Sequence, residues 1–325
     1  MKSVIHEEFG DPATVLKCVE TEDPALGASE ARVEVLRTPI NPSDLLQIAG
    51  QYGVRPDLPT IPGNEGVGRV TDANGTGLED GQLVLLPAGS GTWVTEMVGD
   101  AGIFTPLPEA DLDQLAMLAI NPATAYLLID DFVELAKGDW IIQSAANSAV
   151  GAYVIQLAHA RGLKVACVVR RESAVAGLRE MGADAVLVDS DTLPRDVAQA
   201  TDNAPIRLAL DAVAGDTMAR LADTLAPGGT LVSYGAMSMA PAPLDAKTLI
   251  FSGITLKGFW LAQWFQQATA DRRNQVYGEL TALVASGKLN APVDRHFALD
   301  DIAEAAAYTA AGERDGKVLL APNGV

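Results

Sequence analysis

The hydrophobic pattern divides the chain into two parts of different character. Up to about residue 120, short apolar runs are separated by turns rich in Gly and Pro, as at residues 32–36, 66–70 and 82–86. This spacing predicts a mostly β domain. Further along, apolar runs alternate with segments of helical periodicity, which predicts a doubly wound parallel sheet. The runs of this second part lie at residues 140–143, 164–169, 184–188, 206–210, 229–233 and 254–258.

The end of the chain is predicted to return to the first domain. Residues 271–286 predict one further helix, and residues 316–320 predict a strand that rejoins the β-rich part. We therefore expect an α/β protein with a first domain at 1–120 and 290–325 and a second domain at 121–289. A chain of 325 residues is long enough to form two hydrophobic cores.

The segment 139–171 has the pattern of a β-α-β unit. An apolar run is followed by a small, polar turn at 144–148, and then by a periodic segment that Gly162 closes before the next run. Such a unit places a pyrophosphate on a helix N-terminus. The full G-x-G-x-x-G fingerprint is absent, and of its glycines only Gly151 is present. Taken alone, the segment fits a dinucleotide site and an ordinary buried β-α-β unit equally well.

Two arginines follow the second strand of this unit, where an acidic residue would bind a ribose 2′-hydroxyl. Arg170 and Arg171 instead carry guanidinium groups that suit a 2′-phosphate, which favours NADPH as the cofactor. The alternative is that both are solvated surface arginines.

Composition and charge narrow the class of protein. The chain has 42 acidic and 23 basic residues, a net charge of −19, which disfavours nucleic acid and anionic membranes as partners. No apolar run is long enough to span a bilayer, and the first residues show neither a signal peptide nor a transit pattern. Two cysteines form no disulfide framework. We expect a cytoplasmic protein that acts on a small molecule.

The candidate chemistry involves no metal. The three histidines, His6, His159 and His296, are far apart in sequence, and no Cys-x-x-Cys pair is present, so we predict no zinc site and expect these histidines on the surface or in turns. Tyr52, flanked by glycines, is the outstanding proton donor of the first domain, because a phenol is protonated at neutral pH. By itself it also fits an ordinary surface tyrosine.

Sequence motifs along the whole chain match one family. They are Asn-Pro-Ser-Asp at 41–44, Gly-Gln-Tyr-Gly at 50–53, Gly-Asn-Glu-Gly-Val at 63–67, Gly-Thr-Trp at 91–93, Asn-Pro-Ala-Thr-Ala-Tyr at 121–126, Gly-Asp-Trp-Ile-Ile-Gln at 138–143, Ala-Asn-Ser-Ala-Val-Gly at 146–151, Val-Val-Arg at 168–170, Ser-Tyr-Gly-Ala-Met at 233–237 and Lys-Gly-Phe-Trp-Leu-Ala-Gln-Trp at 257–264. The chain thus resembles the zinc-free, mitochondrial-type trans-2-enoyl-CoA/ACP reductases of the medium-chain dehydrogenase/reductase superfamily. The resemblance implies a GroES-like catalytic domain and a Rossmann cofactor domain.

The resemblance also implies roles for matching residues. Tyr52 is the expected catalytic residue. The expected NADPH contacts are Asn121, Asn147, Ser148, Ala149, Val150, Arg170, Arg171, Tyr234, Gly235, Met237, Phe259, Trp260, Leu261 and Lys317. The expected activity is NADPH-dependent reduction of the carbon–carbon double bond of 2-enoyl thioesters, by a homodimer that associates through residues 230–260. The alternatives are a quinone or enone reductase of the same superfamily and a non-catalytic NADPH-binding protein.

Two segments depart from the family pattern. Where the family commonly has Arg-Asp-Arg, residues 170–172 are Arg-Arg-Glu, which makes the preference for NADPH less strict. The family's Asn-Cys-Val-Gly-Gly has become Asp-Ala-Val-Ala-Gly at 211–215, so contacts near the nicotinamide are expected to differ.

Overall fold

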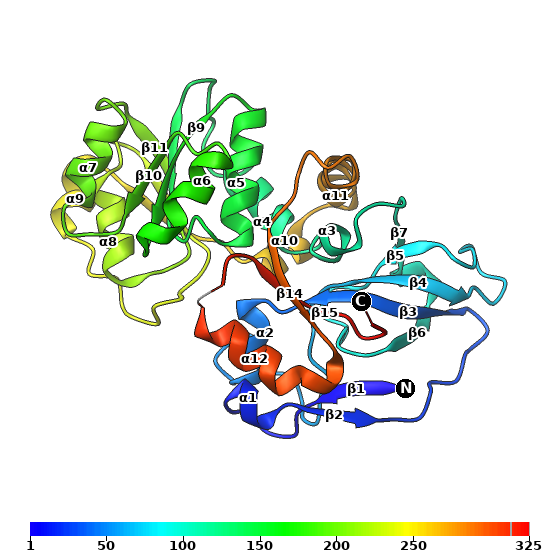
Figure 1. The fold of residues 1–325 in the computed structure, drawn as a ribbon. Coiled ribbons are helices and arrows are strands. Elements are labelled where there is room, and N and C mark those ends of the chain that lie inside the picture. Colours follow the sequence, from blue (N-terminus) through cyan, green and yellow to red (C-terminus); the bar gives the residue numbers. More distant parts are fainter. Residues whose placement is uncertain (313, 325) are drawn as a thin grey trace. The chain divides into compact units, whose positions relative to one another are not determined.

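The computed structural model describes residues 1–312 and 314–324, whose contacts divide into two compact units (Figure 1). Unit 1 comprises Met1–Ile120 and Gly278–Val325, and unit 2 comprises Asn121–Tyr277. Unit 1 is dominated by strands, and unit 2 alternates strands with helices. The predicted fold class is confirmed.

Unit 1 is built around an extended sheet. Its strands are β1 (Lys2–Ile5), β2 (Lys17–Glu20), β3 (Glu30–Pro39), β4 (Val67–Asp72), β5 (Leu83–Leu85), β6 (Glu96–Asp100), β7 (Thr105–Pro106), β14 (Val293–Phe297) and β15 (Lys317–Leu320). Its helices are α1 (Pro12–Val15), α2 (Pro42–Ile48), α3 (Leu112–Ala116) and α12 (Ile302–Ala311), with 3₁₀ turns at Ala101–Ile103 and Leu299–Asp301. The sheet order is β14-β15-β3-β4-β5-β7, with β6 also on β3 and β1 paired separately with β2.

The returning strand of unit 1 is confirmed. β15 pairs with β3 in antiparallel fashion and with β14 in parallel fashion, so the end of the chain completes the sheet that its beginning starts. Along β3, buried and partly exposed residues alternate, as in a half-buried strand. Val33 and Val35 are fully buried by this alternation, and burying each stabilises the unit by about 1.5–3 kcal/mol.

Unit 2 contains the predicted parallel sheet. Its strands are β8 (Trp140–Gln143), β9 (Lys164–Val169), β10 (Ala185–Val188), β11 (Ile206–Asp211), β12 (Thr230–Ser233) and β13 (Thr255–Gly258). Its helices are α4 (Asn121–Asp130), α5 (Ala149–Ala160), α6 (Val175–Glu180), α7 (Leu193–Ala200), α8 (Gly215–Asp223), α9 (Ala246–Ser252) and α10 (Leu261–Gln267), with a 3₁₀ turn at Glu172–Ala174. α11 (Ala270–Ala285) begins in unit 2 and ends in unit 1, and it confirms the helix predicted at 271–286.

The strand order of unit 2 creates a switch point. The order is β10-β9-β8-β11-β12-β13, and neighbouring strands are parallel. The chain therefore runs outward from β8 to β10, returns to β11 beside β8, and then runs outward in the other direction. Doubly wound sheets bind ligands at the carboxyl ends of the strands where the order reverses, which here is between β8 and β11.

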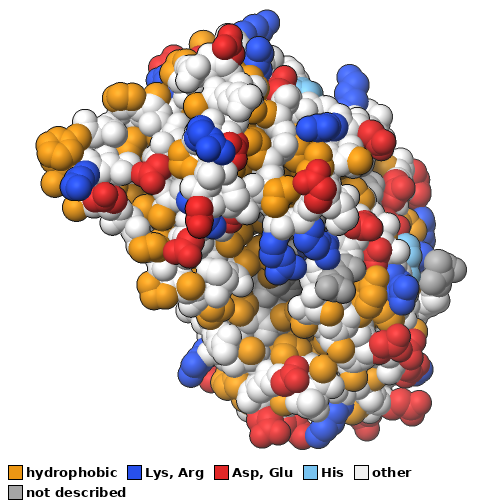
Figure 2. Space-filling model, turned by 60° about the vertical axis from the view of Figure 1, so that its left-hand side comes forward, with side chains coloured by type: hydrophobic (Ala, Val, Ile, Leu, Met, Phe, Trp, Pro, Cys, Tyr) orange, Lys and Arg blue, Asp and Glu red, His pale blue; other side chains and the backbone are white. Residues whose placement is uncertain are grey.

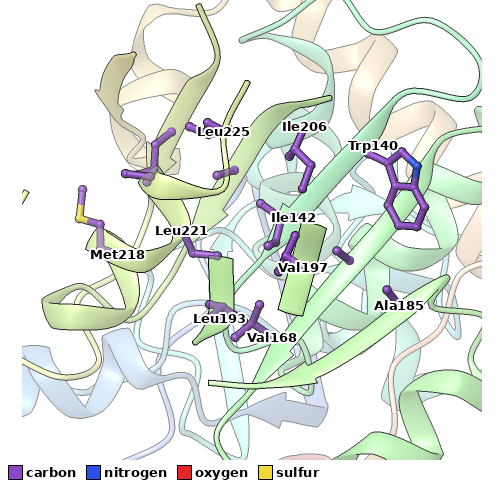
Figure 3. Packing of buried hydrophobic residues seen from close by; sticks show 14 residues of the cluster. Trp140, Ile142, Val168, Ala185, Leu193, Val197, Ile206, Met218, Leu221 and Leu225 are labelled. Carbon is purple, nitrogen blue, oxygen red and sulfur yellow. The ribbon is translucent and has the colours of Figure 1, made fainter. Parts of the chain in front are cut away.

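The core of unit 2 explains why the apolar runs became parallel strands. Figure 3 shows Leu193 and Val197 of α7 lying against the sheet residues Ile142 and Val168. β8 is buried at every position and β9 at every position after the first, as expected for strands covered on both faces. Leu221 of α8 extends the same packing.

The surface carries mixed charge and some exposed apolar side chains. Figure 2 shows acidic and basic side chains interspersed with hydrophobic ones over one face. Within the described part of the chain, no helix is both long and apolar enough to cross a membrane. Ile250 and Phe251 of α9 are 71% and 81% exposed, which marks α9 as a surface that another molecule is able to cover.

Candidate functional site

The turn between β8 and α5 lies at the switch point, and it leads into the capped N-terminus of α5. Ser148 is the N-cap of α5, and its hydroxyl accepts a hydrogen bond from the Gly151 N–H at 3.1 Å. Asn147 is exposed at the same turn, and Ala149 and Val150 form the first turn of the helix. An α-helix of this length presents unpaired N–H groups and the positive end of its dipole at its first turn. The four predicted residues therefore lie together at a phosphate-binding helix end.

Gly151 holds the helix close to this turn. A Cβ at this position would lie 2.2 Å from the carbonyl oxygen of Ala146, which no side chain can accommodate. Glycine is thus required for close helix–turn packing, one of the roles of glycine in dinucleotide-binding turns. The turn fits a dinucleotide although the other glycines are missing.

Arg170 and Arg171 follow the carboxyl end of β9. Arg170 is exposed, Arg171 is partly exposed, and neither guanidinium group has a hydrogen-bonding or ionic partner within residues 1–312 and 314–324. Glu172 begins the 3₁₀ turn that follows, and it is exposed. Two unpaired guanidinium groups at this strand end suit a 2′-phosphate.

The other cofactor candidates of unit 2 lie after β12 and β13. Tyr234 directly follows β12, and its hydroxyl is buried without a hydrogen-bond partner of ordinary geometry, facing the Ser148 side chain. Burial raises the pKa of Tyr234, so it stays protonated. Gly235 allows close approach, since a Cβ there would lie 2.8 Å from the Ala212 carbonyl oxygen. Met237 is 60% exposed beside this segment.

The segment after β13 continues the same edge of the sheet. The N–H of Phe259 donates to the Ser233 carbonyl at 2.9 Å, which ties this segment to the end of β12. The ring of Phe259 meets Phe132 edge-on at 5.8 Å between centroids. Trp260 is 39% exposed as the N-cap of α10, and Leu261 is the first residue of that helix. Asn121 is buried at the start of α4.

Asp211 connects the strand ends at the switch point, and sequence reasoning singled it out only as a departure from the family. Its carboxylate is fully buried at the end of β11 and accepts hydrogen bonds from the Ser144 hydroxyl at 2.8 Å and from the N–H groups of Val213 at 3.1 Å and Ala214 at 2.9 Å. Its carbonyl accepts from the Tyr234 N–H at 2.8 Å. One residue thus fixes the turns after β8, β11 and β12.

In unit 1, Tyr52 lies on a loop that follows α2. The loop leaves the helix through Gly50, whose φ of +71° is a left-handed conformation that glycine adopts without strain. The Gln51 N–H donates to the Leu46 carbonyl at 2.8 Å, and the Arg55 side chain donates to the Gly50 carbonyl at 2.7 Å. These bonds hold the loop, on which Tyr52 is partly exposed.

A buried ionic cluster lies at the start of α2, and we call Asn41, Asp44, Glu65 and Lys317 the unit 1 cluster. The Asn41 side chain donates to Glu65 at 2.8 Å and accepts a hydrogen bond from Lys317 Nζ. Asp44 accepts from the Asn41 backbone N–H at 2.7 Å, which caps α2. The Ile120 N–H donates to Glu65 at 2.9 Å. Lys317, a predicted NADPH contact, is only 6% exposed within this cluster.

Burial shifts the pKa of each ionisable group in the unit 1 cluster. Loss of water raises the pKa of Asp44 to about 6, partly opposed by hydrogen bonds from Asn41 and Asn64. Burial also raises the pKa of Glu65 and lowers that of Lys317, and the attraction between the two charges opposes both shifts. Lys317 is the cation of this cluster, and its charge together with the hydrogen bonds offsets part of the cost of burying the carboxylates.

The described residues contain no group of three or more His, Cys, Asp or Glu side chains that could hold a metal ion. The expectation that all three histidines lie on the surface or in turns is wrong for His6, which is 1% exposed. Burial of the His6 ring is compensated because its Nδ1 hydrogen-bonds to the Glu8 carbonyl at 3.1 Å and the ring contacts Phe9 edge-on.

Comparison with known proteins agrees with this geometry. Residues 27–108 match the alcohol dehydrogenase GroES-like domain, and residues 149–276 match the zinc-binding dehydrogenase family. The mitochondrial enoyl-[acyl-carrier-protein] reductase of Rattus norvegicus is 38% identical over 314 residues, covering 94% of this chain and 84% of the rat enzyme. The corresponding Homo sapiens enzyme is 37% identical, covering 93% and 83%.

Solved structures show the same fold over nearly the whole chain. The complex of Etr1p with NADP and crotonyl-CoA superposes with a TM-score of 0.87 at 28% identity, covering 98% of this chain and 99% of that one. A putative NADPH:quinone reductase from Bacillus thuringiensis has a TM-score of 0.89 at 29% identity, covering 98% of each chain. The Etr1p/Etr2p heterodimer of a mitochondrial 2-enoyl thioester reductase from Candida tropicalis has a TM-score of 0.86 at 28% identity, covering 98% and 99%.

The chain therefore belongs to the medium-chain dehydrogenase/reductase superfamily and, within it, to the enoyl thioester reductase family. The resemblance drawn from the motifs is confirmed. Sequence relatives of the rat and human type and structures of the Etr1p type agree on this assignment.

The comparisons correct the expected location. The cytoplasmic prediction is contradicted by the relatives, which are mitochondrial enzymes in rat, cow, human and Arabidopsis thaliana. The prediction failed because it rested only on a missing targeting pattern, and a missing signal is not evidence for a compartment.

Proposed function

We propose that this protein catalyses the NADPH-dependent reduction of the carbon–carbon double bond of 2-enoyl thioesters. The observation that carries the proposal is the match, over both units, to a reductase whose structure holds NADP and crotonyl-CoA. The sheet edge of unit 2 adds physical support, since it offers a helix N-terminus and two unpaired guanidinium groups to an anionic cofactor.

The residues of unit 2 divide the binding of the cofactor between them. The N–H groups of Ala149 and Val150, at the start of α5, hold the pyrophosphate, and the side chains of Asn147 and the N-cap Ser148 add donors. Arg170 and Arg171 hold the 2′-phosphate, which selects NADPH over NADH. The remaining proposed contacts are Asn121, Tyr234, Gly235, Met237, Phe259, Trp260 and Leu261 from unit 2 and Lys317 from unit 1. Bound NADPH supplies the hydride that the β-carbon receives.

Tyr52 completes the reduction by giving a proton to the α-carbon. Addition of hydride to the β-carbon leaves negative charge on the α-carbon and the thioester oxygen, and a protonated phenol is a suitable acid for that carbanion. The loop bonds at Gly50 and Gln51 restrict where the hydroxyl reaches.

The test is NADPH oxidation with crotonyl-CoA, 2-decenoyl-CoA and a simple quinone in parallel, each repeated with NADH. Rapid thioester turnover with NADPH supports the proposal. Tyr52→Phe should then lower turnover by about 10²-fold or more while NADPH affinity changes less than about twofold. Unchanged turnover in this variant removes Tyr52 from the reaction.

A quinone or enone reductase is the second candidate function. The similarity to the putative quinone reductase from Bacillus thuringiensis supports it, because acceptor specificity depends on pocket residues that a shared fold does not determine. Quinone turnover without thioester turnover selects this function. Cofactor binding without turnover of any acceptor selects the third alternative, a non-catalytic NADPH-binding protein.

We also propose that the protein is a homodimer that associates through the β13 edge of unit 2. β13 ends the sheet and is exposed at all four positions, and Ile250 and Phe251 of the preceding α9 are largely exposed. An unpaired edge next to an apolar surface favours pairing with a second chain. Sedimentation equilibrium of the wild type and of Phe251→Glu tests this: a dimer that the substitution dissociates supports it, and a monomeric wild type refutes it.

A further inference from the structure

Asp211 carries a buried charge, and its hydrogen-bonding partners among the described residues are all neutral. The carboxylate is fully buried and is bonded to one hydroxyl and two backbone N–H groups. The Ser144 hydroxyl itself accepts the Ala212 N–H at 2.9 Å, so its own proton is the one that it gives to Asp211. All these groups donate to the carboxyl, an arrangement that favours the ionised form.

A second carboxylate at the same sheet edge shows the contrast. Asp189 directly follows β10, and the Arg220 guanidinium donates to both of its oxygens, at 2.8 and 2.9 Å. This charge is neutralised within unit 2. Among residues 1–312 and 314–324, no cation is bonded to Asp211 in this way, and the negative charge of Asp189 adds to burial in raising the pKa of Asp211. The unit therefore places an uncompensated negative charge at its switch point.

The position of Asp211 indicates which part of a bound dinucleotide interacts electrostatically with this charge. A doubly wound sheet of this type consists of two mononucleotide-binding halves, and β8 to β10 form the half whose arginines suit the adenosine 2′-phosphate. β11 begins the other half, so Asp211 lies on the nicotinamide side of the switch point. A buried charge in a medium of low dielectric acts over several ångströms without direct contact.

We propose that Asp211 makes the dinucleotide site favour the oxidised cofactor, whose nicotinamide ring is positively charged, over the reduced cofactor, whose ring is neutral. The inference rests on the proposed function and assigns to this site a residue that controls its redox preference. Asp211 then stabilises the positive charge that develops as hydride leaves for the enoyl thioester, an interaction stronger in the transition state than before it.

The experiment measures the dissociation constants of NADP⁺ and NADPH for the wild type and three variants, NADPH by its fluorescence and NADP⁺ by calorimetry. Asp211→Asn removes the charge, and we expect it to weaken NADP⁺ relative to NADPH by about fivefold or more. Ser144→Ala removes a hydrogen bond but keeps the charge. Asp189→Asn makes the same substitution on the other half of the sheet. Both controls should leave the ratio of the two constants within about twofold of the wild-type ratio.

The ratio of the two dissociation constants distinguishes an effect of the lost charge from an effect of a disturbed turn. Asparagine turns an N–H₂ group toward the Ala214 N–H, so the turn loosens, but that loss weakens both cofactors equally. Equal weakening in Asp211→Asn, with the ratio unchanged, overturns the inference and leaves Asp211 a structural residue. Tighter binding of both forms also overturns it, because the charge then faces the pyrophosphate.

The two proposals fail in different ways. A wild type that binds NADP⁺ and NADPH but reduces no enoyl thioester refutes the proposed function, while the measured ratios still decide the role of Asp211. A wild type that binds neither dinucleotide refutes both.

Discussion

Each unit of this protein buries a polar cluster, and the two clusters differ in how their charges are paired. The unit 1 cluster sets Lys317 among the carboxylates of Glu65 and Asp44, with Asn41 bonded to all three. In unit 2, the groups that donate to the Asp211 carboxylate within the described residues are all neutral. The unit 1 cluster contains a cation of its own, whereas no cation is bonded to Asp211 within the part of the chain that the structure describes.

The difference follows from the cost of burying charge. Removing an ion from water costs several kcal/mol, and an opposite charge with good hydrogen bonds offsets much of that cost. A cation held among the carboxylates therefore suits a cluster that joins α2, the first residue of β15 and Ile120. An unpaired charge suits a site whose ligand changes its own charge during the reaction.

The largest expected effect is the loss of stability when the cation of the unit 1 cluster is removed. Lys317→Met leaves two buried carboxylates without their cation, so we expect the free energy of unfolding to fall by about 3–5 kcal/mol in urea titrations. Adding Glu65→Gln to this variant should restore part of the loss, and Lys288→Met, at an exposed lysine, should cost little. A stable Lys317→Met with weakened NADPH binding would instead support the cofactor contact that the family resemblance implies.

The same cluster should make stability depend on pH. Burial raises the pKa of Asp44 from the ordinary 3.8 to about 6, so the folded state favours its protonated form. Its contribution to stability is therefore present below about pH 4 and is lost as the pH rises through about 6. Relative to Asp44→Asn, the wild type should lose about 2.4 kcal/mol of unfolding free energy between pH 4 and pH 7. A pH-independent difference between the two proteins would show that the carboxyl titrates normally.

A third prediction tests whether the guanidinium groups of Arg170 and Arg171 bind the 2′-phosphate of NADPH. Arg170→Ala together with Arg171→Ala should weaken NADPH about 10- to 100-fold, since each lost charge-assisted hydrogen bond is worth about 1.5–3 kcal/mol at most. NADH affinity should stay unchanged, because NADH has no 2′-phosphate. Arg179→Ala, at an exposed arginine of α6, is the matched control. Equal loss of NADPH and NADH affinity would contradict the assignment.

The smallest expected effect concerns the turn that Asp211 holds. Ala214 has φ +63° and ψ −160°, a conformation open essentially to glycine alone. The hydrogen bonds from the N–H groups of Val213 and Ala214 to the Asp211 carboxylate hold the backbone in this conformation. Ala214→Gly should relieve this strain and raise the unfolding free energy by about 1 kcal/mol. Ala160→Gly, at the exposed end of α5, should lower it by up to about 1 kcal/mol. A destabilised Ala214→Gly would show that the turn is unstrained.

The sequence by itself determined the two-part architecture and the family. Alternating and continuous apolar runs predicted β3 and the parallel sheet, and the run at 316–320 predicted β15. These features are local, because the periodicity of side chains along a strand or helix is visible within a few residues. The motifs around Tyr52 and the turn at 144–148 suggested the candidate site, whose residue roles stay predictions.

Only the tertiary structure decided which buried charges meet. Lys317 reaches Asn41 across 276 positions of the chain, and Ser144 reaches Asp211 across 67. No local pattern encodes such pairs, because they depend on which strands become neighbours and on which face each side chain takes. The sequence therefore showed no sign of the buried cluster around Lys317 or of the bonds of Asp211, since burial and hydrogen bonding are properties of the packed structure.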